Sequence, residues 1–437
     1  MLLIYSHKES NRLTYTCNLL FKDIAVCDFK ITTNKEEFDS YEGPRMCYSY
    51  RRREGEMLFI KSVDLLFETG IKDLELKVQP WNQSVSMFQT DSTCDIGFDL
   101  LASSFFMVVR YEEYLPHMRD LYDRFDAQMS LADKEGFLDK AVVNRWANEV
   151  YSKLKAVYPS LKVESTQYKV VTTIDIDNAW AYLEKGIIRT IAGCLKSASQ
   201  FNFRELGDRI KVLSGTKKDP YDTYEYQEEM YERFKLNLVY FFLLGDYGPN
   251  DKNIPYHSRK FQKLIKSLAD IGIAGIHPSF GSNKGIQRLE KEVSRLEGII
   301  NRDVKHSRQH FLKLKLPDTY RNLIDCGVTN DYTMGYASKP GFRAGICTPF
   351  YFYDLDMEME TNLKVHPFMF MEGTFKYYMG KTDKEVLALV KPLVDEVKDL
   401  NGIFVSLWHN DSLNDLGIWK GWRAVFEDVH EYAINGN

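Results

Sequence analysis

Two carboxylates close an apolar run in the middle of the chain. Asp175 and Asp177 end the segment KVVTTIDID. Side chains alternate along a strand, so the two carboxylates point to the same side, where their repulsion raises one pKa unless a cation neutralises them. An isolated D-x-D is also typical of surface carboxylates or a helix N-cap. The apolar VVTTI before the pair weakens these two explanations, because the pair then closes a predicted core strand.

Other polar motifs lie at predicted strands further along. His277 lies in HPS after an apolar strand, RQH (308–310) opens a strand, GFRAG (341–345) forms another, and LWHN (407–410) ends the last. Each alone has a structural explanation: a hydrogen-bonded histidine, an arginine ion pair, a glycine turn or a capped strand end. Together they predict a functional site, because chemistry in α/β folds collects at the carboxyl ends of parallel strands.

The elements that position these motifs alternate between strands and helices. Continuous apolar runs at 169–177, 236–246 and 273–279 are separated by amphipathic helices around 261–268 and 286–296. Such a pattern predicts parallel strands buried on both faces, in a doubly wound sheet or a barrel. Later strands are expected at residues 308–314, 341–346, 364–370 and 402–410, which are enough to approach a closed β/α barrel.

The first 160 residues have a different pattern. Short strand-like pieces (MLLIYS, MCYSY, MLFIKSV, DLELKV) precede a helical segment at 131–158, and the polar stretch PSLKVESTQ then interrupts the pattern. Linkers favour such compositions. We therefore expect a mixed α+β domain at 1–160, of unknown role, followed by an α/β domain at 161–437.

The order of the motifs DID, HPS, RQH, GFRAG and LWHN resembles the polysaccharide deacetylase family, the NodB-homology fold of carbohydrate esterase family four. YSHKESNRLTYTCNLLF, RYEEYLP and RFDAQMS are similar to segments of a bacterial subgroup with an extra N-terminal domain. The resemblance covers nearly the whole chain. It implies a deformed (β/α) barrel and metal-assisted removal of an N-acetyl group from an amino sugar.

The resemblance also implies catalytic roles. Asp175, the first carboxylate of the opening motif, corresponds to the general base, and His409 in LWHN corresponds to the general acid. Arg308 or Arg343 corresponds to the arginine that orients the base, and the sequence alone leaves both open.

The metal ligands implied by the resemblance are Asp177 and His277. The family places a second histidine four residues after the first, where this chain has Gly281. His310 is the candidate replacement, since a histidine after the next crossover can reach the same edge. His257, at a predicted helix start, is a poorer candidate and is expected to be a solvated cap.

Such a set of side chains suits amide hydrolysis. An amide is a poor electrophile, and a divalent ion both lowers the pKa of its water and polarises the carbonyl. Aspartate and imidazole favour zinc, although cobalt, nickel and iron also accept these ligands. An arginine-bound carboxylate can take a proton, and a histidine on the opposite side can protonate the departing amine.

Composition and local sequence features exclude several classes of protein and partner. The 437 residues carry a net charge of −5, with 44% hydrophobic and 27% charged residues, which excludes a disordered chain. The only compact basic run is Arg51 to Arg53, so no nucleic-acid partner is expected. The seven cysteines contain no CxxC, and the chain shows no signal peptide and no apolar run of about 20 residues. These features predict a cytoplasmic protein without a transmembrane segment.

The leading hypothesis is a metal-dependent, zinc-preferring deacetylase of an N-acetylated sugar or glycan precursor. A first alternative is hydrolysis of a non-sugar amide, because fold does not fix substrate. A second is a non-catalytic carbohydrate-binding protein that lost the metal site, which Gly281 favours. The presence of Asp175, Asp177 and His409 together argues against this second alternative.

Overall fold

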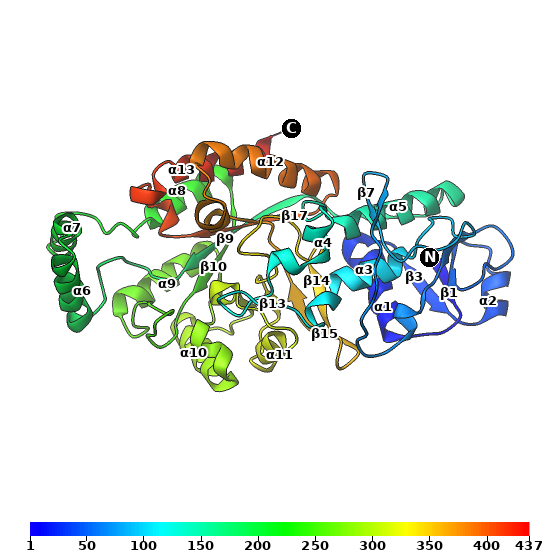
Figure 1. Ribbon diagram of the computed structural model, residues 1–437, viewed down its shortest axis with the longest axis horizontal. Helices are drawn as coiled ribbons and strands as arrows, with labels where there is room; N and C mark the ends of the chain where they lie inside the picture. The colour runs from blue at the N-terminus through cyan, green and yellow to red at the C-terminus, as the bar shows by residue number, and fades with distance from the viewer. Residues whose placement is uncertain (437) are drawn as a thin grey trace.

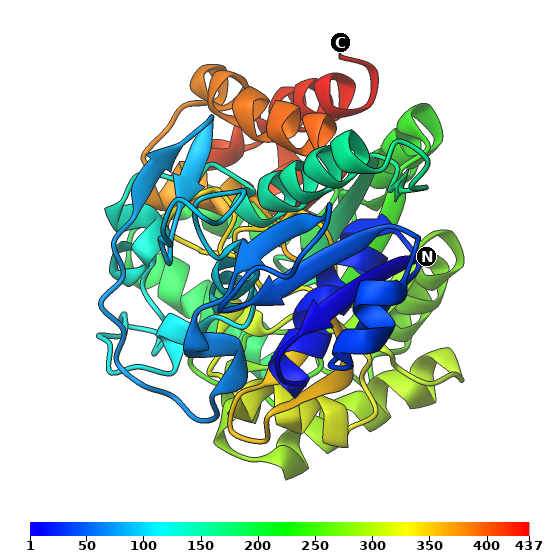
Figure 2. The same ribbon diagram turned by 90° about the vertical axis from the view of Figure 1, so that its right-hand side faces the viewer.

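The computed structural model describes residues 1–436 and contains a smaller and a larger β-sheet (Figure 1). The smaller sheet is parallel and has the order β3 (Phe29–Thr32), β1 (Leu2–Ser6), β4 (Arg45–Ser49) and β5 (Leu58–Lys61). Figure 2 faces this sheet, with the N-terminus at its near side. Its strands match three of the four expected near the N-terminus, whereas residues 73–78 form no strand.

The larger sheet has nine strands in the order β14-β15-β13-β12-β11-β10-β9-β17-β16. All neighbours pair in parallel except β14 and β15. The strands are β9 (Lys169–Ile176), β10 (Asn237–Phe242), β11 (Ile273–Ile276), β12 (His306–Ser307), β13 (Asn330–Asp331), β14 (Phe350–Asp354), β15 (Met359–Val365), β16 (Phe370–Met371) and β17 (Ile403–His409). The α/β class and the parallel sheet agree with the sequence prediction.

The sheet does not close into a barrel. Within residues 1–436 no backbone pairing joins β14 to β16, the two outer strands. The segment predicted as a strand at 341–346 is a turn instead, with positive φ at Gly341 (128°) and Gly345 (64°). Left-handed backbone of this kind cannot continue a strand. The segment predicted as a strand at 308–314 is likewise wrong, because the short 3₁₀ turn η6 (His310–Leu312) lies there.

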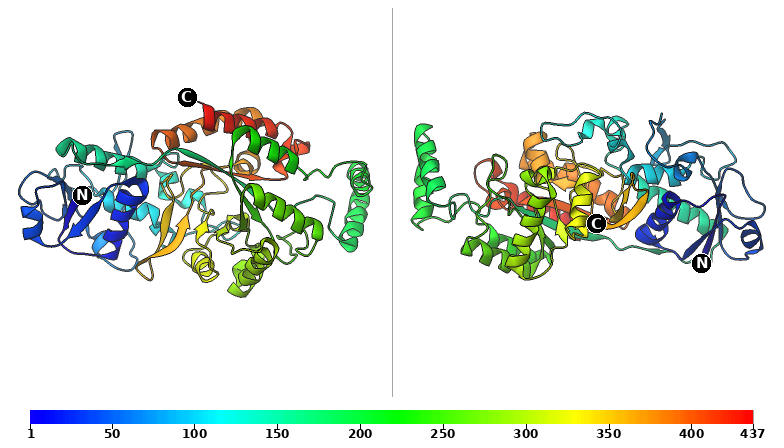
Figure 3. Two further views of the ribbon diagram at one scale, coloured as in Figure 1. Left: turned by 180° about the vertical axis from the view of Figure 1, so that it is seen from behind. Right: turned by 90° about the horizontal axis from the view of Figure 1, so that it is seen from below.

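Helices flank the larger sheet on two sides (Figures 1 and 3). On one side lie α8 (Tyr224–Phe234), α12 (Asp383–Asp399) and α13 (Trp422–Asn435). On the other side lie α9 (Arg259–Ile271), α10 (Ile286–Ile300) and α11 (Asp318–Asp325). Burial of both faces explains why the central strands are continuous apolar runs in the sequence.

The segment before β9 packs directly against the larger sheet. Its helices are α1 (Asn11–Asn18), α2 (Lys35–Ser40), α3 (Leu100–Val108), α4 (Leu131–Lys134) and α5 (Val142–Val157), so the helix predicted at 131–158 is interrupted at 135–141. Two antiparallel pairs, β2 (Ala25–Val26) with β8 (Glu164–Ser165) and β6 (Gln79–Trp81) with β7 (Ser84–Ser86), complete this part. Buried Arg12 donates to Glu358 beyond β14 (Nε to Oε2, 2.8 Å), and one apolar core runs through both parts.

A helical hairpin follows β9 and stands away from the rest of the molecule. It consists of α6 (Ile187–Ser199) and α7 (Phe203–Leu213), drawn at the far left of Figure 1 and clearly separate in both views of Figure 3. It lies on the side toward which β9 and β10 point. Among the described residues, no helix combines the length and apolarity needed to cross a bilayer.

Candidate functional site

The predicted site residues come together at the carboxyl ends of neighbouring strands. Asp175 lies near the end of β9, and Asp177 directly follows that strand. His277 follows β11, His310 lies in η6 after β12, and His409 is the last residue of β17. The strand order places β9 between β10 and β17, and His409 is the register partner of Asp175. Distant sequence segments therefore meet at one sheet edge.

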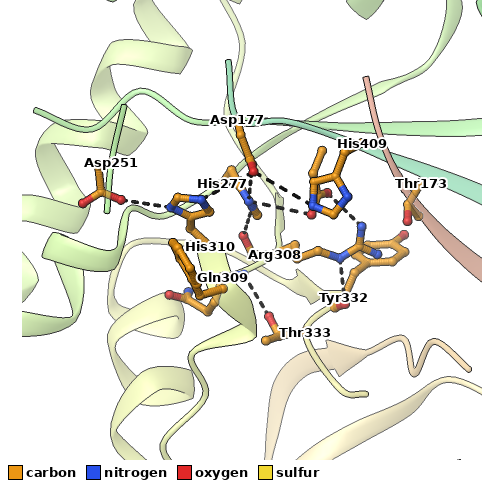
Figure 4. A network of polar contacts seen from close by, with 12 residues as sticks. Thr173, Asp177, Asp251, His277, Arg308, Gln309, His310, Tyr332, Thr333 and His409 are labelled. Atoms are coloured by element: carbon orange, nitrogen blue, oxygen red, sulfur yellow. Dashed lines mark hydrogen bonds and ion pairs between the residues drawn. The ribbon is translucent and has the colours of Figure 1, made fainter. Parts of the chain in front are cut away.

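Asp177, His277 and His310 form a cluster able to hold a metal ion. One ligand atom from each lies within 4.8 Å of the others. His277 Nε2 is 3.1 Å from Asp177 Oδ1, and His310 Nε2 is 3.5 Å from Asp177 Oδ2. Both histidines are buried, while the Asp177 side chain is 37% exposed toward the opening. Figure 4 shows the two rings pointing toward the Asp177 carboxylate.

The hydrogen bonds of the two rings suit them to a cation. His277 Nδ1 lies 2.6 Å from the carbonyl oxygen of Arg308, so Nδ1 donates and Nε2 of the neutral ring keeps its lone pair. That lone pair faces Asp177 Oδ1, a buried oxygen with no hydrogen-bond donor within residues 1–436. Two acceptors at this distance require a proton or a cation between them, and two imidazoles with one carboxylate are a suitable donor set for zinc.

Asp251 orients the second histidine. Its Oδ1 accepts from His310 Nδ1 at 2.9 Å and from the backbone N–H of Phe280 at 2.8 Å, and its Oδ2 accepts from the N–H of Gly281 at 3.0 Å. A carboxylate on the far nitrogen of a ligating histidine fixes the tautomer and raises the basicity of the ring. Asp251 lies in the polar loop PNDKN after β10, and no sequence signal distinguished it.

Arg308 and Arg343 have different partners. Arg308 Nη1 donates to Asp175 Oδ1 at 2.9 Å, and both residues are buried. Arg308 Nε also donates to the carbonyl of Tyr332 at 3.0 Å, which holds the guanidinium in place. Arg343 instead donates to Glu113 through Nε (2.9 Å) and Nη2 (2.6 Å). Of the two arginines that the sequence left open, only Arg308 contacts Asp175.

His409 approaches the carboxylates from another strand. Its Nε2 lies 4.0 Å from Asp177 Oδ2, and its Nδ1 donates to Glu372 Oε1 at 2.8 Å. Glu372, which directly follows β16, is fully buried and also accepts the backbone N–H of His409 at 2.8 Å. Sequence reasoning missed Glu372, although it ends the apolar run HPFMFME in the same way that Asp175 and Asp177 end theirs.

The buried charges shift one another's pKa. Burial alone raises the pKa of Asp177, but the charge of His310 and contacts with both histidines more than offset it and hold this pKa well below its usual range. Burial alone lowers the pKa of His310, yet Asp177 and Asp251 raise it to about 9. The pKa of His409 lies well above its usual range because Glu372 outweighs the effect of burial. These shifts favour the protonated form of His310 and His409.

A cavity of about 170 Å³ opens over these side chains. Asp175, Asp177, His277, His310 and His409 all line it. Its remaining wall is mostly apolar and aromatic and includes Phe311, Leu312, Met371, Tyr377 and Tyr378. The cavity can take a small polar group, with the larger part of a ligand left outside.

Two sequence expectations lie outside the cluster. His257 is exposed and does not line the cavity, as expected for a solvated cap. Gly281 lies behind Asp251 and not on the cavity that contains the histidines. A Cβ built on Gly281 meets Arg288 Nη1 at 3.3 Å and Asp251 Oδ2 at 3.4 Å, so only small shifts of these neighbours would be needed to accommodate a side chain there.

Comparisons with known proteins give distant likenesses. A family of unknown function (DUF7033) matches residues 2–159, and no curated protein matches the chain. A probable polysaccharide deacetylase from Pseudomonas aeruginosa shares 9% identity over 61% of this chain and 85% of its own, with a TM-score of 0.39. A CE4-family pseudoenzyme from Bacillus anthracis shares 10% identity over 61% of this chain and 62% of its own, with a TM-score of 0.27. An allantoinase shares 10% identity over 62% of this chain and 92% of its own, with a TM-score of 0.35. These values are too low to indicate the activity of this chain.

Proposed function

We propose that this protein is a metal-dependent hydrolase that removes an N-acetyl group from an amino sugar or glycan precursor. The observation that carries the proposal is the cluster of Asp177, His277 and His310, whose rings are oriented by the Arg308 carbonyl and Asp251. A divalent ion held there, zinc by the donor set, would supply activation of water and polarisation of the amide carbonyl.

Asp175 is the proposed general base. It is buried beside the cluster, 3.7 Å from His277 Nε2 through Oδ2, and its Oδ1 is bound by Arg308. The guanidinium stabilises the ionised carboxylate, and a carboxylate is the form that accepts a proton from water. Arg308 acts through Asp175 and is therefore a positioning residue.

His409 is the proposed general acid. Glu372 fixes its ring and favours the imidazolium, which leaves the Nε2 proton facing the cavity. An amine leaving as an anion is unstable, so a proton delivered from this side lowers the barrier of C–N cleavage. Because the base and the acid extend from the paired strands β9 and β17, the sheet fixes their separation.

The domain division and the cellular location are part of the same proposal. Residues 1–160 and 161–437 are proposed as two domains, and the match to the family of unknown function at residues 2–159 supports a boundary near residue 160. A cytoplasmic location is proposed from the sequence features. The ion pair of Arg12 with Glu358 joins the first domain to the segment between β14 and β15.

Metal content tests the centre of the proposal. After reconstitution with zinc, elemental analysis should find one ion per chain in the wild type and a strongly reduced content in Asp177→Ala. Asp246→Ala, which removes an exposed carboxylate on the loop that carries Asp251, is the matched control and should retain the metal. Equal metal content in wild type and Asp177→Ala would contradict the assignment.

Substrate class is tested with the metal-loaded protein. Incubation with N-acetylated sugars, glycolipid precursors and unrelated amides should release acetate from the sugars, with loss of the reaction on chelation. Product from other amides alone would favour the non-sugar hydrolase. Binding of a glycan without any product would favour the non-catalytic alternative, which the glycine at position 281 suggested.

The proton-transfer roles predict a bell-shaped pH dependence of the rate. Asp175→Asn should flatten the acidic limb and His409→Ala the basic limb, while each variant retains its metal. Near-normal turnover in Asp175→Asn would exclude the role as base.

A further inference from the structure

The hairpin formed by α6 and α7 exposes an unusual amount of apolar surface. Eight of the 25 exposed large hydrophobic side chains within residues 1–436 lie in the 27 residues from 187 to 213. They are Ile187 (79%), Ile188 (85%), Ile191 (54%), Leu195 (65%), Phe201 (79%), Phe203 (65%), Ile210 (55%) and Leu213 (43%). Scattered exposed apolar residues are normal, but such a concentration marks a contact surface.

The spacing of these residues makes each helix amphipathic. Ile187, Ile191 and Leu195 recur every four residues along α6, and Phe203 and Ile210 are seven residues apart on α7, so each set lies on one helix face. At the tip, the rings of Phe201 and Phe203 contact each other edge to face, with centroids 6.3 Å apart. The apolar surface therefore extends from the base of the hairpin to its tip.

Basic side chains flank this surface. Residues 187–213, which form the hairpin, contain five Lys or Arg and two Asp or Glu, a net charge of +3 in a chain whose total is −5, so the other residues sum to −8. The two acidic residues are paired, Glu205 with Arg209 at 3.1 Å and Asp208 with Lys217 at 2.8 Å.

Three cations of the hairpin remain free. Lys196, Arg204 and Lys211 are exposed and have no ion-pair partner in the part of the chain that the structure describes. Each directly follows an exposed apolar residue in the sequence: Lys196 follows Leu195, Arg204 follows Phe203 and Lys211 follows Ile210. Apolar and basic side chains are thus interleaved along the same two helices.

We propose that the hairpin α6–α7 docks the protein on an anionic lipid surface. Apolar side chains flanked by lysine and arginine on a short helix are typical of helices that lie in the membrane interface, with the apolar face among the acyl chains and the cations at the headgroups. At 13 residues, α6 is roughly 20 Å long, which is too short to span a hydrocarbon core of about 30 Å. The contact is therefore peripheral.

Charge complementarity favours lipid over a second copy of the chain. Two hairpins packed face to face would bring +3 against +3, and like charges in close contact oppose association. An anionic surface attracts the hairpin and repels the rest of the molecule, which carries −8. The protein would then contact the membrane through the protruding hairpin alone, as its separation from the body in Figures 1 and 3 allows.

The base of the hairpin is anchored to the body. Arg189 on α6 donates from Nη1 to the carbonyl of Asn253 at 2.9 Å and from Nη2 to that of Lys252 at 3.0 Å. Asp219 after α7 accepts the backbone N–H groups of Ala181 and Tyr182 at 2.7 and 2.9 Å. These contacts position the hairpin relative to the sheet, and none involves its exposed apolar side chains. The docking proposal does not depend on the proposed function.

Vesicle flotation tests the proposal on the full chain. The wild type should float with vesicles of phosphatidylcholine mixed with phosphatidylglycerol, should stay in solution with phosphatidylcholine alone, and should lose binding as salt is raised. Because one basic residue near an anionic surface contributes a factor of about five to partitioning, Arg204→Glu with Lys211→Glu should weaken it by about thirtyfold or more. Phe201→Ser with Phe203→Ser should weaken it by at least about tenfold.

Matched controls separate the hairpin from general charge effects. Lys155→Glu with Lys162→Glu reverses two exposed lysines at the same sequence spacing in another part of the chain, and Leu121→Ser removes a fully exposed leucine. Both should bind as the wild type does. Equal loss in hairpin and control variants, no binding of wild type to anionic vesicles, or a dimer in solution that the hairpin variants convert to monomer would each overturn the proposal.

Discussion

Asp251→Asn is the most informative single change at the candidate metal site. The carboxylate accepts from the His310 ring and from the backbone N–H groups of Phe280 and Gly281. Asparagine keeps the shape but loses the charge, and its amide group has a single acceptor for these three donors. The His310 ring is then less basic and less well oriented.

The expected loss of zinc affinity follows from that change. Removing the hydrogen-bond partner on the far nitrogen of a ligating histidine lowers metal affinity by about 10- to 100-fold, which corresponds to roughly 1.4–2.7 kcal/mol of binding free energy. Isothermal titration against a competing chelator at fixed pH measures the difference, and circular dichroism checks that the fold is retained. Asp246→Asn, on the same loop but bound to Lys291 and Arg295 at the surface, should change affinity by less than about twofold. Wild-type affinity in Asp251→Asn, or an equal loss in both variants, would refute the assigned role of Asp251.

Three further changes test other parts of the site and the core. His409→Ala should lower acetate release by about 10²- to 10⁴-fold while zinc content stays unchanged, and parallel loss of metal would show instead that His409 is a ligand. Arg308→Met leaves buried Asp175 unpaired and should reduce the free energy of unfolding by about 3–5 kcal/mol in urea titrations; an unchanged midpoint would contradict this. Burial lowers the pKa of the His430 ring in the folded protein from 6.5 to about 4. Because the unfolded chain therefore binds the ring proton more tightly, the free energy of unfolding should fall by roughly 3 kcal/mol as the pH is lowered from 7 to 4. His430→Gln should flatten that decline in acid denaturation curves, and an equally steep curve would exclude His430 as its source.

The central strands could be predicted because their burial requires apolar residues at consecutive positions, which is a local sequence pattern. The runs ending at Ile176, Phe242 and Ile276 are apolar on both faces, and a buried parallel strand requires this. The carboxylates that end the first run were visible for the same reason, since charge at the end of a core strand is costly unless it is paired or functional. The strand that ends at His409 was equally clear.

The short strands and turns could not be predicted in this way. Segment 308–314 has strand-like composition, yet β12 is only two residues long and His310 lies in a 3₁₀ turn after it. Segment 341–346 is a turn in which Arg343 is buried against Glu113, more than two hundred residues earlier in the chain. A partner so distant leaves no local signal, and without that strand the sheet remains open.

The sequence by itself determined which side chains were candidates: Asp175, Asp177, His277 and His409 lie in strand-end motifs that resemble a known family, and His310 was the candidate replacement for the ligand missing at Gly281. The tertiary structure decided how they are arranged and oriented. It placed Asp251 behind His310, Glu372 behind His409 and Arg308, not Arg343, on Asp175. The physical reason is that residue type and alternation are local properties, whereas a hydrogen bond across a sheet depends on strand order and register, which only packing of the whole chain fixes.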